Sequence, residues 1–167
     1  MNKMICYDNK EIFFNNCPAC DYANHEYEIS CGMAYENNLF TLSQDWELPI
    51  AGFMVISPKK HIENFNELTK LERDEMFDIV NKTINILKQN KVCDRFNVLW
   101  EEKEGRHFHA WIVPRHKWMS EKFGNITKNL NSIFNYALNN LKTEENFIEI
   151  SRVNNLVKTE LNKKAIN

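Results

Sequence analysis

The chain has 167 residues, 43% of them hydrophobic and 26% charged, and its formal net charge is −2. A chain of this length can bury a hydrophobic core that is stable without disulfide bonds or structural metal ions, so we expect a single domain over residues 1–167. The slight negative charge argues against a general nucleic-acid binder, and the lack of a long apolar run or an apolar N-terminal segment argues against a membrane protein and favours a cytoplasmic one.

A cytoplasmic location bears on the cysteines, since disulfides are rare there and thiols either stay reduced or bind metals. The five cysteines are Cys6, Cys17, Cys20, Cys31 and Cys93. Only four glycines and four prolines occur, so we expect short connections rather than flexible linkers.

The first half of the chain predicts a hairpin, a buried strand and a long helix. Residues 12–36 are expected to be irregular around a CPAC turn, and MAYEN and LFTLS within 33–43 are predicted strands joined at Asn37-Asn38. GFMVISP (52–58) predicts a buried strand. Thr69 and Glu72 form a capping-box pattern that predicts the start of a helix. The apolar stripe of that helix comprises Met76, Phe77, Val80, Ile84 and Leu87.

The second half predicts a strand pair followed by helices. RFNVLW (95–100) and HFHAWIV (107–113) resemble strands joined by a short charged connection, which favours a hairpin. Beyond Lys117 apolar residues recur at helical spacing, and we expect them to pack on the sheet or on a second subunit. The two stripes are Leu130, Ile133, Phe134, Ala137 and Leu141, then Phe147, Ile150, Val153, Val157 and Leu161. Because the connections are too short for parallel crossovers, the expected fold class is α+β, with an antiparallel sheet and a C-terminal helical extension over about 120–167.

The CPAC turn (17–20) places two thiols where they can clasp one metal ion, but a metal site needs further ligands. Two completions compete. Adding His25 and Cys31 gives a spacing close to a zinc knuckle, a nucleic-acid-binding module, although the last gap is one residue too long. Adding His61 and His107 instead gives a non-local site. A redox role for the thiols would need a thioredoxin-like setting that the rest of the chain does not supply.

The segment RHFHAWIVPR (106–115) carries two histidines one residue apart on a predicted strand. Strand alternation would place His107, His109 and Trp111 on one face. A neutral imidazole is nucleophilic at one nitrogen while the other nitrogen donates a hydrogen bond that fixes the ring. A polar strand facing solvent would explain the histidines but would leave Trp111 and Val113 exposed, so we favour the floor of a functional site.

Together, the blocks CPAC, GFMVISPKKHIEN and HFHAWIVPR resemble the histidine triad (HIT) superfamily, whose signature is His-φ-His-φ-His-φ-φ with φ hydrophobic. The resemblance covers about residues 15–118. It implies a HIT-like antiparallel sheet of about five strands flanked by helices, often paired as a two-fold homodimer. It also implies a nucleotide hydrolase or nucleotidyltransferase that acts on phosphoramidate, phosphoanhydride or dinucleoside polyphosphate bonds.

The resemblance also implies roles for individual residues. The middle histidine of the motif, His109, corresponds to the nucleophile that forms a nucleotidyl–histidine intermediate. Zinc-carrying members bind the ion through residues that correspond here to Cys17, Cys20, His61 and His107. Four such ligands make a closed, structural zinc site, which leaves the chemistry to His109.

Two departures from the family pattern bear on the expected activity. Trp111 replaces the third motif histidine, and an indole can donate one hydrogen bond but cannot shuttle a proton. We expect Trp111 to contact a phosphate or a base, or to pack beneath the pocket. The loop before the motif is acidic rather than glycine-rich, which makes Lys103 and Arg106 the expected phosphate contacts. Asn97 lies near an asparagine that contacts ribose or phosphate in the family, so the resemblance makes it a further substrate-binding candidate. The alternative function is therefore a catalytically silent nucleotide-binding or scaffold protein.

Overall fold

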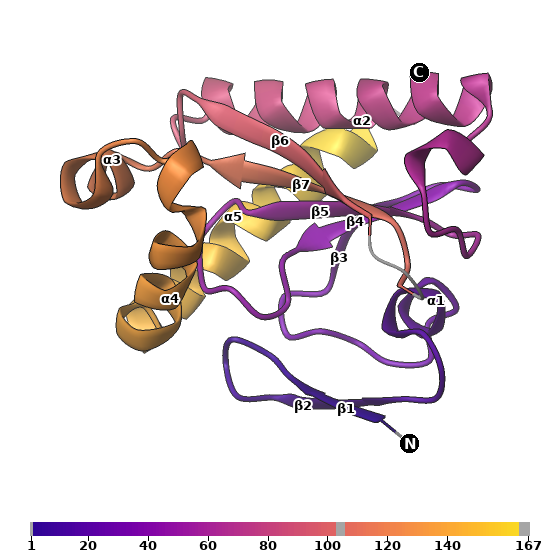
Figure 1. Ribbon diagram of the computed structural model, residues 1–167, viewed down its shortest axis with the longest axis horizontal. Coiled ribbons are helices and arrows are strands. Elements are labelled where there is room, and N and C mark those ends of the chain that lie inside the picture. The colour runs from indigo at the N-terminus through magenta and orange to yellow at the C-terminus, as the bar shows by residue number, and fades with distance from the viewer. Residues whose placement is uncertain (1, 103–105, 164–167) are drawn as a thin grey trace.

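The computed structural model describes residues 2–102 and 106–163, and Figure 1 shows their arrangement. The strands are β1 (Asn2–Ile5), β2 (Glu11–Phe14), β3 (Met33–Glu36), β4 (Phe40–Gln44), β5 (Met54–Pro58), β6 (Phe96–Glu101) and β7 (His109–Pro114). The helices are α1 (Pro18–Ala23), α2 (Lys70–Gln89), α3 (Lys117–Phe123), α4 (Leu130–Asn140) and α5 (Glu144–Lys163), and short 3-10 turns cover Phe65–Glu67 and Thr127–Asn129. Within the described ranges, no helix is both long and apolar enough to cross a membrane.

The described strands form a five-stranded antiparallel sheet in the order β3-β4-β5-β7-β6, and β1 pairs with β2 as a separate hairpin. Both expected pairings, β3 with β4 and β6 with β7, are present. β7 lies between β5 and β6, so the strand that begins at His109 is paired with a neighbour on both sides. The predicted α+β class, with about five antiparallel strands and C-terminal helices, is confirmed.

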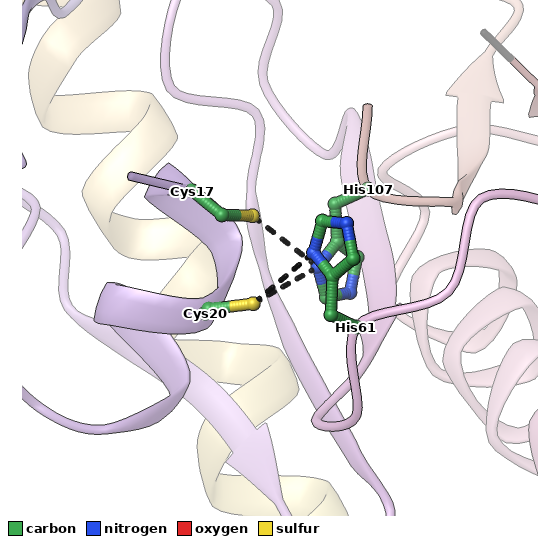
Figure 2. A group of neighbouring side chains, drawn as sticks. All are labelled: Cys17, Cys20, His61 and His107. Carbon is green, nitrogen blue, oxygen red and sulfur yellow. Dashed lines mark hydrogen bonds between the residues drawn. The ribbon is translucent and has the colours of Figure 1, made fainter. Parts of the chain in front are cut away.

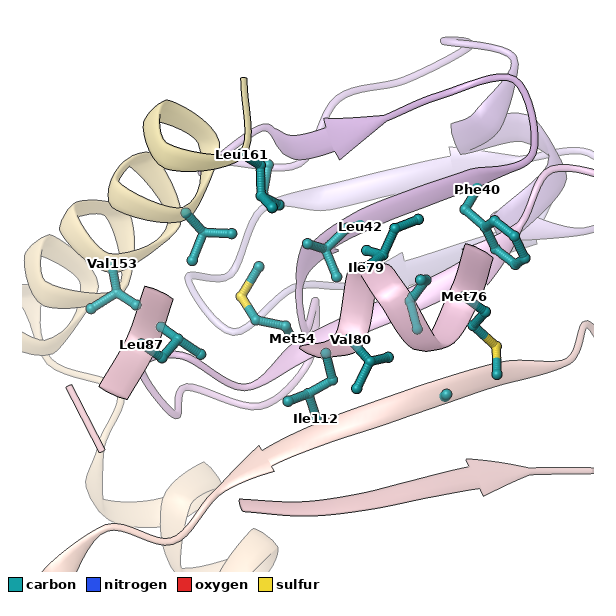
Figure 3. Close-up of a cluster of buried hydrophobic side chains, with 14 of the residues drawn as sticks. Phe40, Leu42, Met54, Met76, Ile79, Val80, Leu87, Ile112, Val153 and Leu161 are labelled. Carbon is teal, nitrogen blue, oxygen red and sulfur yellow. The ribbon is translucent and has the colours of Figure 1, made fainter. Parts of the chain in front are cut away.

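One face of the sheet packs against the two long helices, α2 and α5. Side chains from β4, β5 and β7 meet those of both helices in one buried cluster, which Figure 3 shows. Leu42, Met54 and Ile112 come from the sheet, and Val153 comes from α5. Burying side chains of this size stabilises the fold by roughly 1.5–3 kcal/mol each. The stripes predicted for α2 and α5 face this core, except that Phe77 is exposed.

The opposite face of the sheet is only partly covered. At one end, Trp111 and Val113 of β7 pack with Phe53 and with Phe134 of α4 in a second cluster, to which α3 also contributes. The β1–β2 hairpin and α1 flank the same face away from α3 and α4 (Figure 1). The tail helices therefore pack on both faces of this sheet, and α4 closes one side of the space above β7.

Three local features differ from the sequence-based expectations. Residues 12–36 are not irregular throughout, because they contain β2 and α1 in addition to β3, which the MAYEN segment predicted. α1 has only six residues and begins at Pro18, which is too short to show helical periodicity but suits proline at a first turn. The predicted strand 107–113 begins only at His109, so His107 lies just before β7. By contrast, α2 begins as predicted: the backbone N–H of Thr69 donates to the Glu72 carboxylate, and the backbone N–H of Glu72 donates to the Thr69 hydroxyl.

His116 gives the fold a testable pH dependence. Its Nε2–H donates to the carbonyl oxygen of Ala51 at 2.8 Å, and burial lowers its pKa below the ordinary 6.5, although that hydrogen bond and Glu149 oppose the shift. A depressed folded-state pKa contributes stability that is complete above pH 6.5 and is lost as the pH falls below it.

We therefore expect the free energy of unfolding to fall between pH 7 and pH 5 by up to about 1.4 kcal/mol per pH unit from this one group. Glutamine can keep the donor to Ala51 without titrating, so His116→Gln should show a smaller fall. Urea unfolding of both proteins at several pH values measures the difference. Parallel pH profiles of the two proteins would contradict this role of His116.

Candidate functional site

A pocket of about 880 Å³ opens on the partly covered face of the sheet. Its floor includes His109 and Trp111 of β7 and Val55 of β5. The N-terminal hairpin contributes Met4 and Phe14 to its wall. The pocket is also lined by Cys17, Cys20, His61 and His107, the four residues of the expected non-local metal site. Segments far apart in the sequence thus meet at a single site.

At one side of this pocket, Cys17, Cys20, His61 and His107 bring their side chains together (Figure 2). Their ligand atoms all lie within 4.8 Å of one another. The Nδ1 atom of His107 lies 3.4 Å from each of the two sulfurs, and the Nδ1 atom of His61 lies 3.4 Å from Cys20 Sγ. Zn–S and Zn–N bonds of ordinary length in a tetrahedral site would separate sulfur and nitrogen by about 3.6 Å. The group therefore fits a tetrahedral metal ion.

The four ligands reach the site from three segments of the chain. Cys17 precedes α1 and Cys20 lies in its first turn, so the short helix presents both sulfurs on one side. His61 follows β5 and His107 precedes β7, which are neighbouring strands in the sheet. A metal held here would join the N-terminal segment to the central strands.

The hydrogen bonds and pKa values of the group suit metal binding. A carbonyl oxygen can only accept, so the 2.8 Å contact between His107 Nε2 and the Pro58 carbonyl places the proton on Nε2 and turns the Nδ1 lone pair toward the sulfurs. Burial lowers the pKa of His107 to about 4, which keeps the imidazole neutral. Burial and the neighbouring Cys17 raise the pKa of Cys20 to about 12, so a metal would have to displace a thiol proton.

The local zinc-knuckle completion is not assembled. His25 is 62% exposed and its Nε2 lies 3.3 Å from a carboxylate oxygen of Glu36. Cys31 packs in a separate cluster around Cys6 and Tyr22. Among the described residues, neither joins the metal-ligand group, which takes His61 and His107 instead.

His109 is held in a defined orientation above the strand. Its Nδ1 lies 3.1 Å from the carbonyl oxygen of His107, which can only accept, so Nδ1 carries a proton and donates it. Its Nε2 lies 3.5 Å from Oε2 of Glu101, the residue directly opposite on β6. The imidazole therefore has one nitrogen fixed by the backbone, and the other nitrogen can act on a ligand.

Trp111 packs against aromatic rings on three sides. Its ring centroid lies 5.8 Å from those of Phe53 and Phe134, both edge to face, and 5.7 Å from that of His109. Edge-to-face pairs of this kind contribute about 0.5–1.5 kcal/mol beyond the buried area. Trp111 thus supports the pocket floor and shares its face with His109, as strand alternation predicts.

The other expected substrate contacts lie in different places. Arg106 is exposed and lines the pocket. Asn97 does not line it, and its side-chain amide donates to Thr127 Oγ1 at 3.2 Å. The register pairs Asn97 with Val113, four residues along β7 from His109 or roughly 13 Å, so a ligand contact of Asn97 stays a prediction. Lys103 lies outside the described residues.

The structure adds acidic residues that the motif did not indicate. Asp45 follows β4 and lines the pocket, and burial raises its pKa to about 7 although the backbone N–H groups of Glu47 and Leu48 donate to it. Glu101 is the second addition. A polar residue directly after a buried strand is a signal that could have indicated Asp45. Only the β6–β7 register places Glu101 beside His109.

No family model matches the chain. An uncharacterised HIT-like protein of Methanocaldococcus jannaschii is 31% identical over 118 residues, which cover 66% of this chain and 88% of the relative. A Zn-bound histidine triad family protein from Mycobacterium smegmatis superposes with a TM-score of 0.63 at 14% identity, over 89% of this chain and 96% of that one. A HIT family protein from Bacillus anthracis gives a TM-score of 0.53 at 24% identity, over 76% and 98% of the two chains. Motif, fold and relative agree, and the chain belongs to the histidine triad (HIT) superfamily.

Proposed function

We propose that the protein is a nucleotide hydrolase or nucleotidyltransferase that cleaves phosphoramidate, phosphoanhydride or dinucleoside polyphosphate bonds. The observation that carries this proposal is the imidazole of His109, which is fixed at Nδ1 by the His107 carbonyl and lines a pocket of about 880 Å³. A backbone acceptor at Nδ1 leaves Nε2 as the attacking nitrogen. The pocket is large enough for a nucleotide.

The chemistry has two displacements at the α-phosphorus. Nε2 of His109 forms a bond to phosphorus while the bond to the leaving group breaks, and that group departs with the electron pair and takes a proton from water. A water molecule, or an acceptor in a transferase, then adds to phosphorus. The N–P bond breaks, its electron pair returns to Nε2, and the proton of the water passes to solvent. Two displacements replace one difficult step.

We further propose that Arg106 and Trp111 contact the substrate. Arg106 offers a guanidinium at the pocket wall, which suits a bidentate contact with phosphate oxygens. Trp111 cannot give a proton to a leaving group, so its contribution is its ring, which shares the floor with His109.

We propose zinc as the metal of the Cys17, Cys20, His61 and His107 group. Two sulfurs and two imidazole nitrogens form a donor set that zinc prefers, and the structural neighbour from Mycobacterium smegmatis is a Zn-bound protein. With four protein ligands the ion has no open coordination position. Its role is therefore structural: it holds α1 against the segment after β5 and the segment before β7, next to His109. Bound zinc also supplies charge that holds both thiolates deprotonated.

The activity can be tested with adenosine 5′-phosphoramidate and with diadenosine tri- and tetraphosphate. We expect release of adenosine monophosphate from at least one of them, and an alkaline quench should preserve a nucleotidyl adduct on the peptide that contains His109. Mass spectrometry of the digested protein locates the adduct. If adenosine monophosphate binds but no substrate turns over and no adduct forms, the silent nucleotide-binding alternative replaces the proposal.

We also propose that the protein forms a two-fold homodimer through β6, one of the two edge strands of the five-stranded sheet. An unpaired strand edge is a template for antiparallel pairing with a second copy. Apolar side chains are exposed on β6 and the adjacent α2: Val98 is 37% exposed, Trp100 46% and Phe77 47%.

A charge at this edge should therefore separate the two copies. Trp100→Glu is expected to halve the mass measured by light scattering or sedimentation. Ile148→Glu is the matched control, because Ile148 is 65% exposed on α5, away from β6. A monomeric wild-type protein, or equal effects of the two substitutions, would contradict the proposed interface.

A further inference from the structure

The strongest unassigned feature of the pocket is the carboxylate of Glu101. Glu101 is the last residue of β6, and the register places it directly opposite His109 on β7. Its Oε2 lies 3.5 Å from Nε2 of His109. Both side chains line the pocket. Because the two backbones are paired, the carboxylate can leave this position only by rotating its side chain.

The position that Glu101 takes is the one a substrate needs. A reacting atom must approach the attacking nitrogen to about 3–3.5 Å before a bond can form. A phosphate group that approaches Nε2 at that distance therefore comes close to the carboxylate, whose Oε2 is 3.5 Å from the same nitrogen. The two stay close even if the side chain of Glu101 rotates, because the strand pairing holds its backbone in place.

The surrounding charges strengthen this effect. Among the described residues that line the pocket, Asp21, Asp45, Glu47 and Glu101 are acidic, and Arg106 is the only Lys or Arg. Two like charges a few ångströms apart repel in water, and they repel more strongly where the surrounding protein lowers the effective dielectric constant. Each additional phosphate charge near Glu101 therefore costs binding energy that a neutral or cationic leaving group does not cost.

We propose that Glu101 is a specificity residue that selects substrates by the charge of the leaving group. It admits a singly charged nucleoside phosphoryl group whose leaving group is an amine, and it disfavours polyphosphate leaving groups. This inference rests on the proposed nucleotidyl transfer through His109. It assigns Glu101 to discrimination between substrates and not to the displacement itself.

The test compares kcat/KM for two substrates with the same base, adenosine 5′-phosphoramidate and diadenosine tetraphosphate. The wild-type protein should prefer the phosphoramidate. Glu101→Gln keeps the size of the side chain and removes the charge, so it should raise kcat/KM for the tetraphosphate about ten-fold, mainly through a lower KM. The phosphoramidate carries the same α-phosphate but no further phosphate charge, so its kcat/KM should rise less, by no more than about three-fold.

Glu47→Gln is the matched control, because Glu47 lines the same pocket but, among the described residues, forms neither a hydrogen bond nor an ion pair with His109. It should change the ratio of the two kcat/KM values by less than about three-fold. An unchanged ratio in Glu101→Gln, or an equal change in Glu47→Gln, would overturn the role of Glu101 while leaving nucleotidyl transfer in place. Failure of the wild-type protein to turn over either substrate would instead overturn the proposed function, and this inference with it.

Discussion

His61→Ala is expected to abolish zinc binding, whereas His25→Ala should leave one ion bound per chain. Both histidines are exposed, so neither substitution opens a cavity in the core. His61 Nδ1 lies 3.4 Å from Cys20 Sγ in the metal-ligand group, while His25 interacts with Glu36. Removing one of four ligands leaves an open position and two thiols whose protons the ion no longer displaces efficiently.

The loss of zinc should also lower stability, because the ion joins α1 to the segment that follows β5 and to the segment that precedes β7. We expect the melting temperature of His61→Ala to fall by roughly 5–10 °C, the shift that about 2–3 kcal/mol produces in a chain of this size. A chelator should lower the melting temperature of the wild-type protein similarly, and the variant should not respond to it. Metal content by atomic absorption and thermal unfolding measure both effects. Zinc that survives in His61→Ala but not in His25→Ala would restore the knuckle site.

Much of the fold could be predicted because its signals are local. The reciprocal pair Thr69 and Glu72 marks the start of α2, since both partners lie within four residues. The stripes of α4 and α5 likewise depend only on spacing. The β1–β2 hairpin gave no comparable signal, because its strands have four residues each and Phe13 is exposed. Strands this short do not display a reliable period.

The residues of the site could be predicted where they belong to a sequence motif. They could not be predicted where only the three-dimensional structure brings them to the site. His61 and His107 are 46 residues apart, and the family pattern linked them before the structure placed them together. Asn97 was expected to contact the substrate because it lies near a substrate-contacting asparagine of the family pattern. The position of a strand residue depends on the strand register, and the sequence of the charged loop does not determine that register. The same uncertainty hid Glu101, since its contact with His109 exists only through the β6–β7 pairing.

The substitution with the largest expected effect on activity is His109→Ala. It removes the proposed nucleophile and leaves its backbone acceptor, the His107 carbonyl, able to bind water. We expect kcat for adenosine 5′-phosphoramidate to fall by at least about 10³-fold, with no nucleotidyl adduct and with adenosine monophosphate still bound. Single-turnover measurements with the purified variant separate lost chemistry from lost binding.

Trp111 supplies the decisive comparison on the same strand face. Trp111→Phe keeps an aromatic ring between Phe53 and Phe134 and removes only the indole N–H, so turnover should stay within about ten-fold of wild type. Trp111→His restores the family motif but leaves part of the space between those rings unfilled, and it should cost about 2–3 kcal/mol of stability while retaining the adduct on His109. If Trp111→Phe lost activity as fully as His109→Ala, the indole N–H would have a role in the reaction that packing does not explain. If His109→Ala kept activity, the nucleophile would have to be another group in the pocket.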